Sequence, residues 1–337
     1  MELLTVTQER KIPIRKENSH FSETTVIREK KYTINPFIEA NTINVSLFHL
    51  KNECVIPVFA KDNEQTISHQ EFVDISLSIA KSYYPNEIIE NPEIRVSHQV
   101  KGRTPEAIHI PAKELLDNQK TIYHERMAFI IRISSVTETI NGNELSLCIG
   151  GVRSYNHENL YSKKTMEKFK FFIGFQNMVC CNMCISTDGF KSELKATSIL
   201  ELESKIRKIV EGYSCSRHLK RMKDLVSHSL SEKQFAQLIG KSRLYNHLPK
   251  AERVQLPELL LNDNHFNTIA KDYFADKSFC KNIDGTINLW HVYNLLTGAN
   301  KSSYIDTFLD RSVNAFGFAE GVSKAINGDS QYRWFLS

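Results

Sequence analysis

The residues of this chain that could do chemistry gather between Gly151 and Lys223. This stretch carries 14 Lys and Arg against 7 Asp and Glu, a net charge of 14 − 7 = +7, whereas the whole chain has a formal net charge of +4. The rest of the chain is therefore slightly acidic. A positive field concentrated in one region suits a polyanion such as nucleic acid. Unevenly placed lysines on a solvated face would give the same count, so both interpretations stay open.

One run inside this stretch interleaves cations with aromatic rings. Single-strand binding proteins need both, because cations follow the phosphates and bases stack on rings for ~1–3 kcal/mol each. A strand with phenylalanines in the core and lysines in water has the same pattern, and we favour that interpretation for the rings. It leaves the lysines available for phosphate contact. The contacts predicted in this run are Lys163, Lys164, Lys168, Lys170 and Phe171.

Further cations decorate the two helices predicted after this run. Four of them fall on one face of the second helix, since residues three and four apart are neighbours on a helix. This stripe could follow a phosphate backbone, although a solvated helix surface would look the same. The cations predicted here are Lys205, Arg207 and Lys208 on the first helix, with Arg217, Lys220, Arg221 and Lys223 on the second.

Two short cysteine motifs offer metal ligands. Cys181 and Cys184 form a C-x-x-C, and Cys215 and His218 form a C-x-x-H, which together could hold tetrahedral zinc. The first pair lies in VCCNMCIS, which reads as strand, and residues three apart on a strand point to opposite faces. Free cysteine also behaves as a small buried hydrophobe. We therefore predict no metal and no cofactor.

No catalytic signature accompanies these residues. The sequence contains no G-x-S-x-G, no Walker A loop and no G-x-G-x-x-G, and its 12 histidines are scattered. The spacing of its carboxylates shows no cluster suited to two-metal chemistry. We predict no catalytic residue and favour a protein without catalytic activity over an enzyme.

A hairpin is the clearest element that would position the basic residues. Met127–Ile140 is apolar and β-branched, and Asn141-Gly142 best tolerates the positive φ angles of a type I′ turn. The alternation that follows predicts a return strand, which Gly150-Gly151 should end or bulge. Further strands are predicted at 171–186 and at 190–197.

The pattern becomes helical after residue 198. Capping boxes at Ser198/Glu201 and Ser231/Gln234 introduce a series of amphipathic helices. The fold class is therefore α+β, an antiparallel hairpin-rich sheet with packed helices followed by a mainly helical C-terminal part. The 337 residues exceed the ~250–300 of a typical single core. We predict a mobile N-terminal arm at 1–35, a sheet domain at 36–198 and a helical region at 199–337 packed on it.

The chain shows no sign of a membrane or a secretory route. No run approaches the ~18 apolar residues of a membrane span, and MELLTVTQERKIPIRK has no apolar core of a signal peptide. Seven cysteines without regular spacing argue against a secreted disulfide framework. We expect a cytoplasmic protein without a membrane partner, and leave an oligomer open.

Three segments carry a resemblance to a known family. They are PVFAKDNEQTISHQEF at 57–72, the stretch at 149–190 that includes IGGVRSYNHENLYSKK, and GTINLWHVYNLLTGANKSSYIDTFLDRSVNAF at 285–316. They resemble a family of unknown function from Bacteroidetes that tends to occur on conjugative and integrated elements. Cys181-Asn182 and the helix with Asn294 and Thr297 also resemble a wider phage- and plasmid-borne family of unknown function. The resemblance implies a mobile-element setting and no mechanism.

Our leading hypothesis is a non-enzymatic DNA-binding protein of a mobile genetic element. A hairpin-rich sheet followed by a basic helix suits single-strand binding or annealing in recombination or transfer, by analogy of fold alone. One alternative is a protein-interaction module that acts on a host or defence factor. The other is a metal-dependent enzyme that uses the Cys and His residues. The partner is thus nucleic acid, with single-stranded DNA favoured, or a protein.

Overall fold

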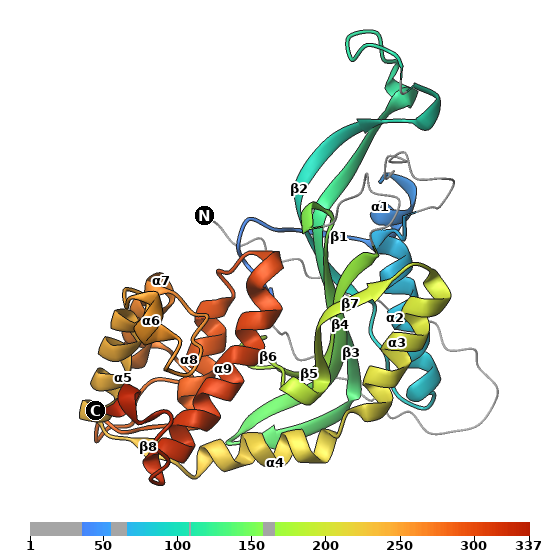
Figure 1. The fold of residues 1–337 in the computed structure, drawn as a ribbon. Coiled ribbons are helices and arrows are strands. Elements are labelled where there is room, and N and C mark those ends of the chain that lie inside the picture. The colour runs from blue at the N-terminus through green and yellow to red at the C-terminus, as the bar shows by residue number, and fades with distance from the viewer. Residues whose placement is uncertain (1–35, 55–65, 108, 158–165) are drawn as a thin grey trace, which may run out of the picture. The chain divides into compact units, whose positions relative to one another are not determined.

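The fold is built around an antiparallel sheet whose longest strands form a hairpin (Figure 1). The computed structural model describes residues 36–54, 66–107, 109–157 and 166–337. Here the sheet neighbours follow the chain and all pair antiparallel, which confirms the α+β class. The strands in this order are β1 (Ile43–Val45), β2 (Glu93–Arg103), β3 (Lys120–Ile140), β4 (Asn143–Ser154), β5 (Glu167–Asn177) and β6 (Met183–Cys184), and β7 (Phe190–Ala196) also pairs with β5.

The predicted hairpin is confirmed. β3 and β4 are joined by Asn141 and Gly142 alone, whose φ angles are 47° and 77°. Both angles lie in the left-handed region that a type I′ turn requires, and Asn and Gly adopt it at low cost. The turn chemistry therefore fixes the register in which Ile140 faces Asn143.

Gly150 and Gly151 do not end the return strand, contrary to the prediction. β4 continues through them to Ser154, and the irregularity in pairing lies between Ile133 and Thr137. A Cβ on Gly151 would lie 2.5 Å from the ring of Phe72. The glycines therefore let an aromatic layer pack directly against the backbone.

Helices cover both faces of the sheet (Figure 1). Alternate residues of a strand point to opposite faces. On β3, Phe129 joins the cluster that contains Phe72 of α2 (His69–Tyr83) and residues of α3 (Ile199–Gly212). Its neighbour Ile130 joins a second cluster with Phe308 of α9 (Ile305–Ile326). The central strands are consequently apolar on both sides.

The helical C-terminal part is confirmed. Ser231 and Gln234 form the predicted capping box, whereas Ser198 caps its helix alone because Glu201 accepts from the Thr197 N–H instead. The remaining elements are α1 (Leu47–Asn52), α4 (Cys215–Val226), β8 (Ser229–Leu230), α5 (Glu232–Tyr245), α6 (Lys250–Arg253), α7 (Asp263–Ala275), β9 (Ile287–Asn288) and α8 (Leu289–Asn300). In the part of the chain that the structure describes, no helix has the length and hydrophobicity to cross a membrane.

Some predictions concern residues that the structure does not describe. The arm at 1–35 lies outside the described residues, as do Lys163 and Lys164. The boundary between residues 198 and 199 stays a prediction. One hydrophobic cluster nevertheless includes residues from both sides of it, such as Ile131 of β3 and Trp290 of α8.

The aromatic layer on Gly151 yields a stability prediction. Gly151→Ala should lower the free energy of unfolding by about 1–3 kcal/mol, because the new methyl group overpacks the contact with Phe72. Gly317→Ala in α9 is the matched control, since nothing lies within 4 Å of its added Cβ. That change should leave stability unchanged or raise it by up to about 1 kcal/mol. Urea denaturation measures both, and equal stability of Gly151→Ala and the parent would contradict the packing.

Candidate nucleic-acid interface

The interleaved run divides between core and surface. Phe171 on β5 is fully buried with an exposed fraction of 0%, so no base can stack on it. It belongs to the cluster that packs against α2 and α3, because odd-numbered residues of this strand face that layer. Lys168 and Lys170 alternate with it and reach the opposite side. The assignment of the Phe171 ring to the interface is therefore wrong, and the assignment of the two lysines stays a prediction.

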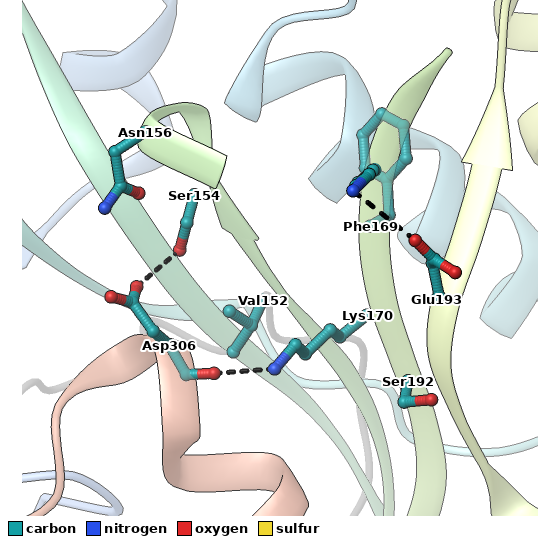
Figure 2. Close-up of a pocket in the computed structure, with 9 residues that line it drawn as sticks. Val152, Ser154, Asn156, Phe169, Lys170, Ser192, Glu193 and Asp306 are labelled. Atoms are coloured by element: carbon teal, nitrogen blue, oxygen red, sulfur yellow. Dashed lines mark hydrogen bonds and ion pairs between the residues drawn. The ribbon is translucent and has the colours of Figure 1, made fainter. Parts of the chain in front are cut away.

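Those two lysines form ion pairs within the protein. The Lys170 ammonium donates to the Asp306 carbonyl oxygen at 2.6 Å and pairs with Asp310, as Figure 2 shows in part. Lys168 lies 3.5 Å from Glu193. They line a pocket of about 380 Å³ that also contains Glu193 and Asp306. Carboxylates therefore balance the positive charge of this pocket.

The predicted basic stripe on α4 contains both exposed cations and cations that form ion pairs. Arg217 and Lys220 are exposed, and Lys223 lies 3.4 Å from Glu138. Arg221 donates from Nε and Nη2 to the Glu320 carboxylate at 2.6 and 2.5 Å, and its guanidinium lies 4.9 Å from the ring centre of Phe316. Arg221 therefore holds α4 against α9 and is not available for phosphate.

The cations of α3 also differ in whether they form ion pairs within the protein. Lys205 and Arg207 pair with the carboxylates four residues earlier, at 2.7 and 2.8 Å. Lys208 is exposed, and the described residues include no ion pair to it. Arg207 also stacks near the ring of Tyr83, which ties α3 to α2.

A positively charged surface lies between β7 and α3. A groove of about 480 Å³ is lined there by four lysines and one glutamate, a balance of 4 − 1 = +3, with the apolar side chains of Leu194 and Ile209. We call this the lysine groove. Its charged lining is Lys191, Glu193 and Lys195 from β7 with Lys205 and Lys208 from α3.

The lysines keep the neighbouring carboxylates ionised. The hydrogen bond from Lys195 lowers the pKa of Glu193. A hydrogen bond from Lys205, with others from Thr197, lowers the pKa of Glu201 to about 2. Glu193 therefore pairs with Lys195 and Glu201 with Lys205, which leaves Lys191 and Lys208 as the groove lysines without an ion pair among the described residues.

The predicted interface omits Lys191 and Lys195. The alternation of FKSELKAT predicts a strand, but the pairing of β5 with β7 shifts between Phe169, opposite Leu194, and Phe171, opposite Lys191, so a period of two does not hold through β7. Lys191 and Lys195 could have been joined to the basic residues of α3 only by knowing that β7 and α3 lie side by side.

The Cys and His motifs do not form one ligand set within the described ranges. The strand predicted across Cys181 ends at Asn177, and Cys181 lies in the following turn with a φ of 58°. Cys184 is buried in β6, and His218 lies in the core 2.8 Å from the Tyr213 hydroxyl. Burial lowers the pKa of His218 to about 3, so the ring is neutral.

An α+β protein with a sheet covered on both faces and a basic groove at one edge is what these observations define. The family model described as "Domain of unknown function, B. Theta Gene description (DUF3871)" matches residues 20–336. The chain therefore belongs to this family. No curated protein and no solved structure matches it.

The buried His218 predicts a pH dependence of stability. Its pKa is about 3 in the folded protein and about 6.5 in an unfolded chain, so only the unfolded state takes up this proton as pH falls from 6.5 to 3. The free energy of unfolding should fall by up to about 1.4 kcal/mol per pH unit from this residue alone.

Guanidinium denaturation of His218→Asn across this range measures that slope. The variant should lose less stability per pH unit than the parent, whatever its stability at neutral pH. His247→Asn is the control, because His247 is exposed and should leave the slope unchanged. Parallel curves for the parent and His218→Asn would contradict the assignment.

Proposed function

We propose that this protein binds nucleic acid by its phosphate backbone, without base-specific contacts, through the lysine groove. The observation that carries the proposal is the excess of lysine in the groove, where Lys195 pairs with Glu193 and Lys205 with Glu201, but Lys191 and Lys208 have no ion pair among the described residues. Phosphate contacts dominate nucleic-acid affinity and need cations that are not already neutralised. Lys191 and Lys208 meet that requirement, whereas Arg221 on the predicted stripe does not.

A second role competes for the same lysines. Lysines on an edge strand keep it from pairing with another chain, and among the described strands β7 pairs with β5 alone. Here, however, the Lys205 ammonium from α3 donates to the Lys195 carbonyl oxygen at 2.6 Å. Because α3 already covers part of this edge, edge protection alone leaves the exposed Lys191 and Lys208 unexplained.

The strand preference, the genetic setting and the cellular compartment rest on separate arguments. A preference for single strands stays a prediction, since Phe171 is buried and supplies no stacking surface. The mobile-element setting rests on the resemblance of the three segments named above. The cytoplasm is supported by seven cysteines that are all free, as expected in a reducing compartment.

Neutralising the groove tests the proposal. The triple variant Lys191→Gln, Lys195→Gln and Lys208→Gln should bind a labelled single-stranded oligonucleotide more weakly, and roughly equally for all sequences. The slope of log K against log salt should flatten by about 0.7 for each phosphate that the variant no longer neutralises, or about 1.4 for Lys191 and Lys208, because Lys195 already pairs with Glu193. Fluorescence anisotropy across a salt series measures both quantities.

A matched variant carries the same change of charge elsewhere. Lys233, Lys250 and Lys277 are exposed and lie outside the groove, so replacing all three by Gln should leave the salt slope close to that of the parent. Unfolding curves establish that both triple variants are folded. If the parent binds no oligonucleotide at low salt, or if both variants lose affinity equally, the groove is not the binding site.

A further inference from the structure

Three side chains that could bind a metal ion lie close together beside the first residues of β3. His49 comes from α1, Cys54 follows that helix, and His124 comes from β3. Cys54 reaches β3 through an isolated bridge to Ile122. The Nε2 atoms of the two histidines are 3.0 Å apart, and Cys54 Sγ lies 3.5 Å from His49 Nε2. All three ligand atoms lie within 4.8 Å of one another.

Two of these separations, from His49 Nε2 to His124 Nε2 and to Cys54 Sγ, are close to those of a tetrahedral zinc site. With zinc–nitrogen bonds of about 2.05 Å and a zinc–sulfur bond of about 2.3 Å, tetrahedral angles put two nitrogens about 3.3 Å apart and nitrogen and sulfur about 3.6 Å apart. The observed 3.0 and 3.5 Å need only a small adjustment of the rings. The atoms that converge are also the usual ligand atoms of zinc, imidazole nitrogen and cysteine sulfur.

A carboxylate contacts the ring nitrogen of His49 that faces away from the cluster. Glu53 Oε2 lies 2.7 Å from His49 Nδ1, the ring nitrogen that faces away from the cluster. Zinc-bound histidines almost always donate this second N–H to a carboxylate or carbonyl, which fixes the tautomer with a lone pair on Nε2. The contact therefore prepares His49 Nε2 to act as a ligand.

We propose that His49, Cys54 and His124 bind one zinc ion. Three protein ligands leave one coordination position, and sites of this kind complete it with water or a small ligand. A cavity of about 20 Å³ adjoins the cluster and is lined by residues that include Cys54, His69, His124 and Tyr155. That volume accommodates one water molecule.

One buried nitrogen gives this water a partner. His69 Nε2 donates to the His124 carbonyl oxygen, so His69 Nδ1 is an acceptor, and it has no hydrogen-bond partner among the described residues although the side chain lines the cavity. A buried polar atom without a partner costs about 1–3 kcal/mol. A zinc-bound water that donates to His69 Nδ1 would offset part of that cost.

A plain hydrogen bond between the two imidazoles is the competing explanation. One neutral histidine can donate from Nε2 to the other at 3.0 Å without any metal. That explanation assigns no ligand role to Cys54 and predicts no effect of Glu53 on metal affinity. Titration of the purified full chain with Co²⁺, a spectroscopic substitute for Zn²⁺, separates the two.

The metal-free protein should bind one equivalent of Co²⁺, and excess Zn²⁺ should displace it. A thiolate-to-cobalt charge-transfer band and the intense visible bands of a tetrahedral site should appear together. Cys54→Ser should abolish the charge-transfer band, and His49→Gln should weaken binding. Both residues lie at or beside the short helix α1, so these variants disturb the sheet less than a change at His124 on β3. Glu53→Gln should weaken binding about 10–100-fold with the same spectrum.

Cys215→Ser is the matched control, because Cys215 is also half-buried and lies outside the cluster. It should leave the affinity and the spectrum unchanged. Circular dichroism establishes that each variant is folded. Absence of stoichiometric binding by the parent would overturn the proposal, and so would a charge-transfer band that survives Cys54→Ser and disappears in Cys215→Ser.

Discussion

Burial of both faces of the central strands is the constraint on which the rest of this structure depends. β3, β4 and β5 lie between α2 and α3 on one side and α9 on the other, so both faces are buried at residues 127–131 of β3, 145–152 of β4 and 171–177 of β5. Odd and even positions must both be apolar, as Phe129 and Ile130 show. Where rings need room above a strand, only glycine fits, and Gly151 under Phe72 is the clearest case.

This constraint moves the candidate sites to the rim of the sheet. The lysine groove lies where the edge strand β7 meets α3, and the His49, Cys54 and His124 cluster lies where α1 meets β3. Other charged residues form ion pairs that hold elements of the fold together. Arg153 is fully buried and pairs with Glu167, which also accepts the Ile67 N–H, and Arg221 joins α4 to α9. A buried charge of this kind must be paired to be tolerated at all.

Local chemistry made much of the fold predictable. The positive φ angles at Asn141 and Gly142, and the capping box of Ser231 and Gln234, depend on residues only a few positions apart. The error at Gly150-Gly151 came from a distant contact, because the ring of Phe72 packs on Gly151 of β4 from 151 − 72 = 79 residues earlier in the chain.

The candidate sites were less predictable for the same reason. The sequence shows the excess of positive charge between residues 151 and 223, but it does not show which of these residues form ion pairs. Glu320, which neutralises Arg221, is about 100 residues away. His124 is similarly remote from His49 and Cys54, and nothing in the spacing of the three joins them. Only the pairing of strands and helices does.

Direct mapping of a bound strand tests the claim that the lysine groove holds phosphate. Photo-crosslinking of a single-stranded oligonucleotide to the full chain, followed by mass spectrometry of the peptides, locates the contact without mutation. The account predicts saturable adducts on the segments 191–195 of β7 and 205–208 of α3, and their loss when salt is raised. Adducts confined to Arg217 and Lys220 on α4, or none that an unlabelled competitor displaces, would contradict it.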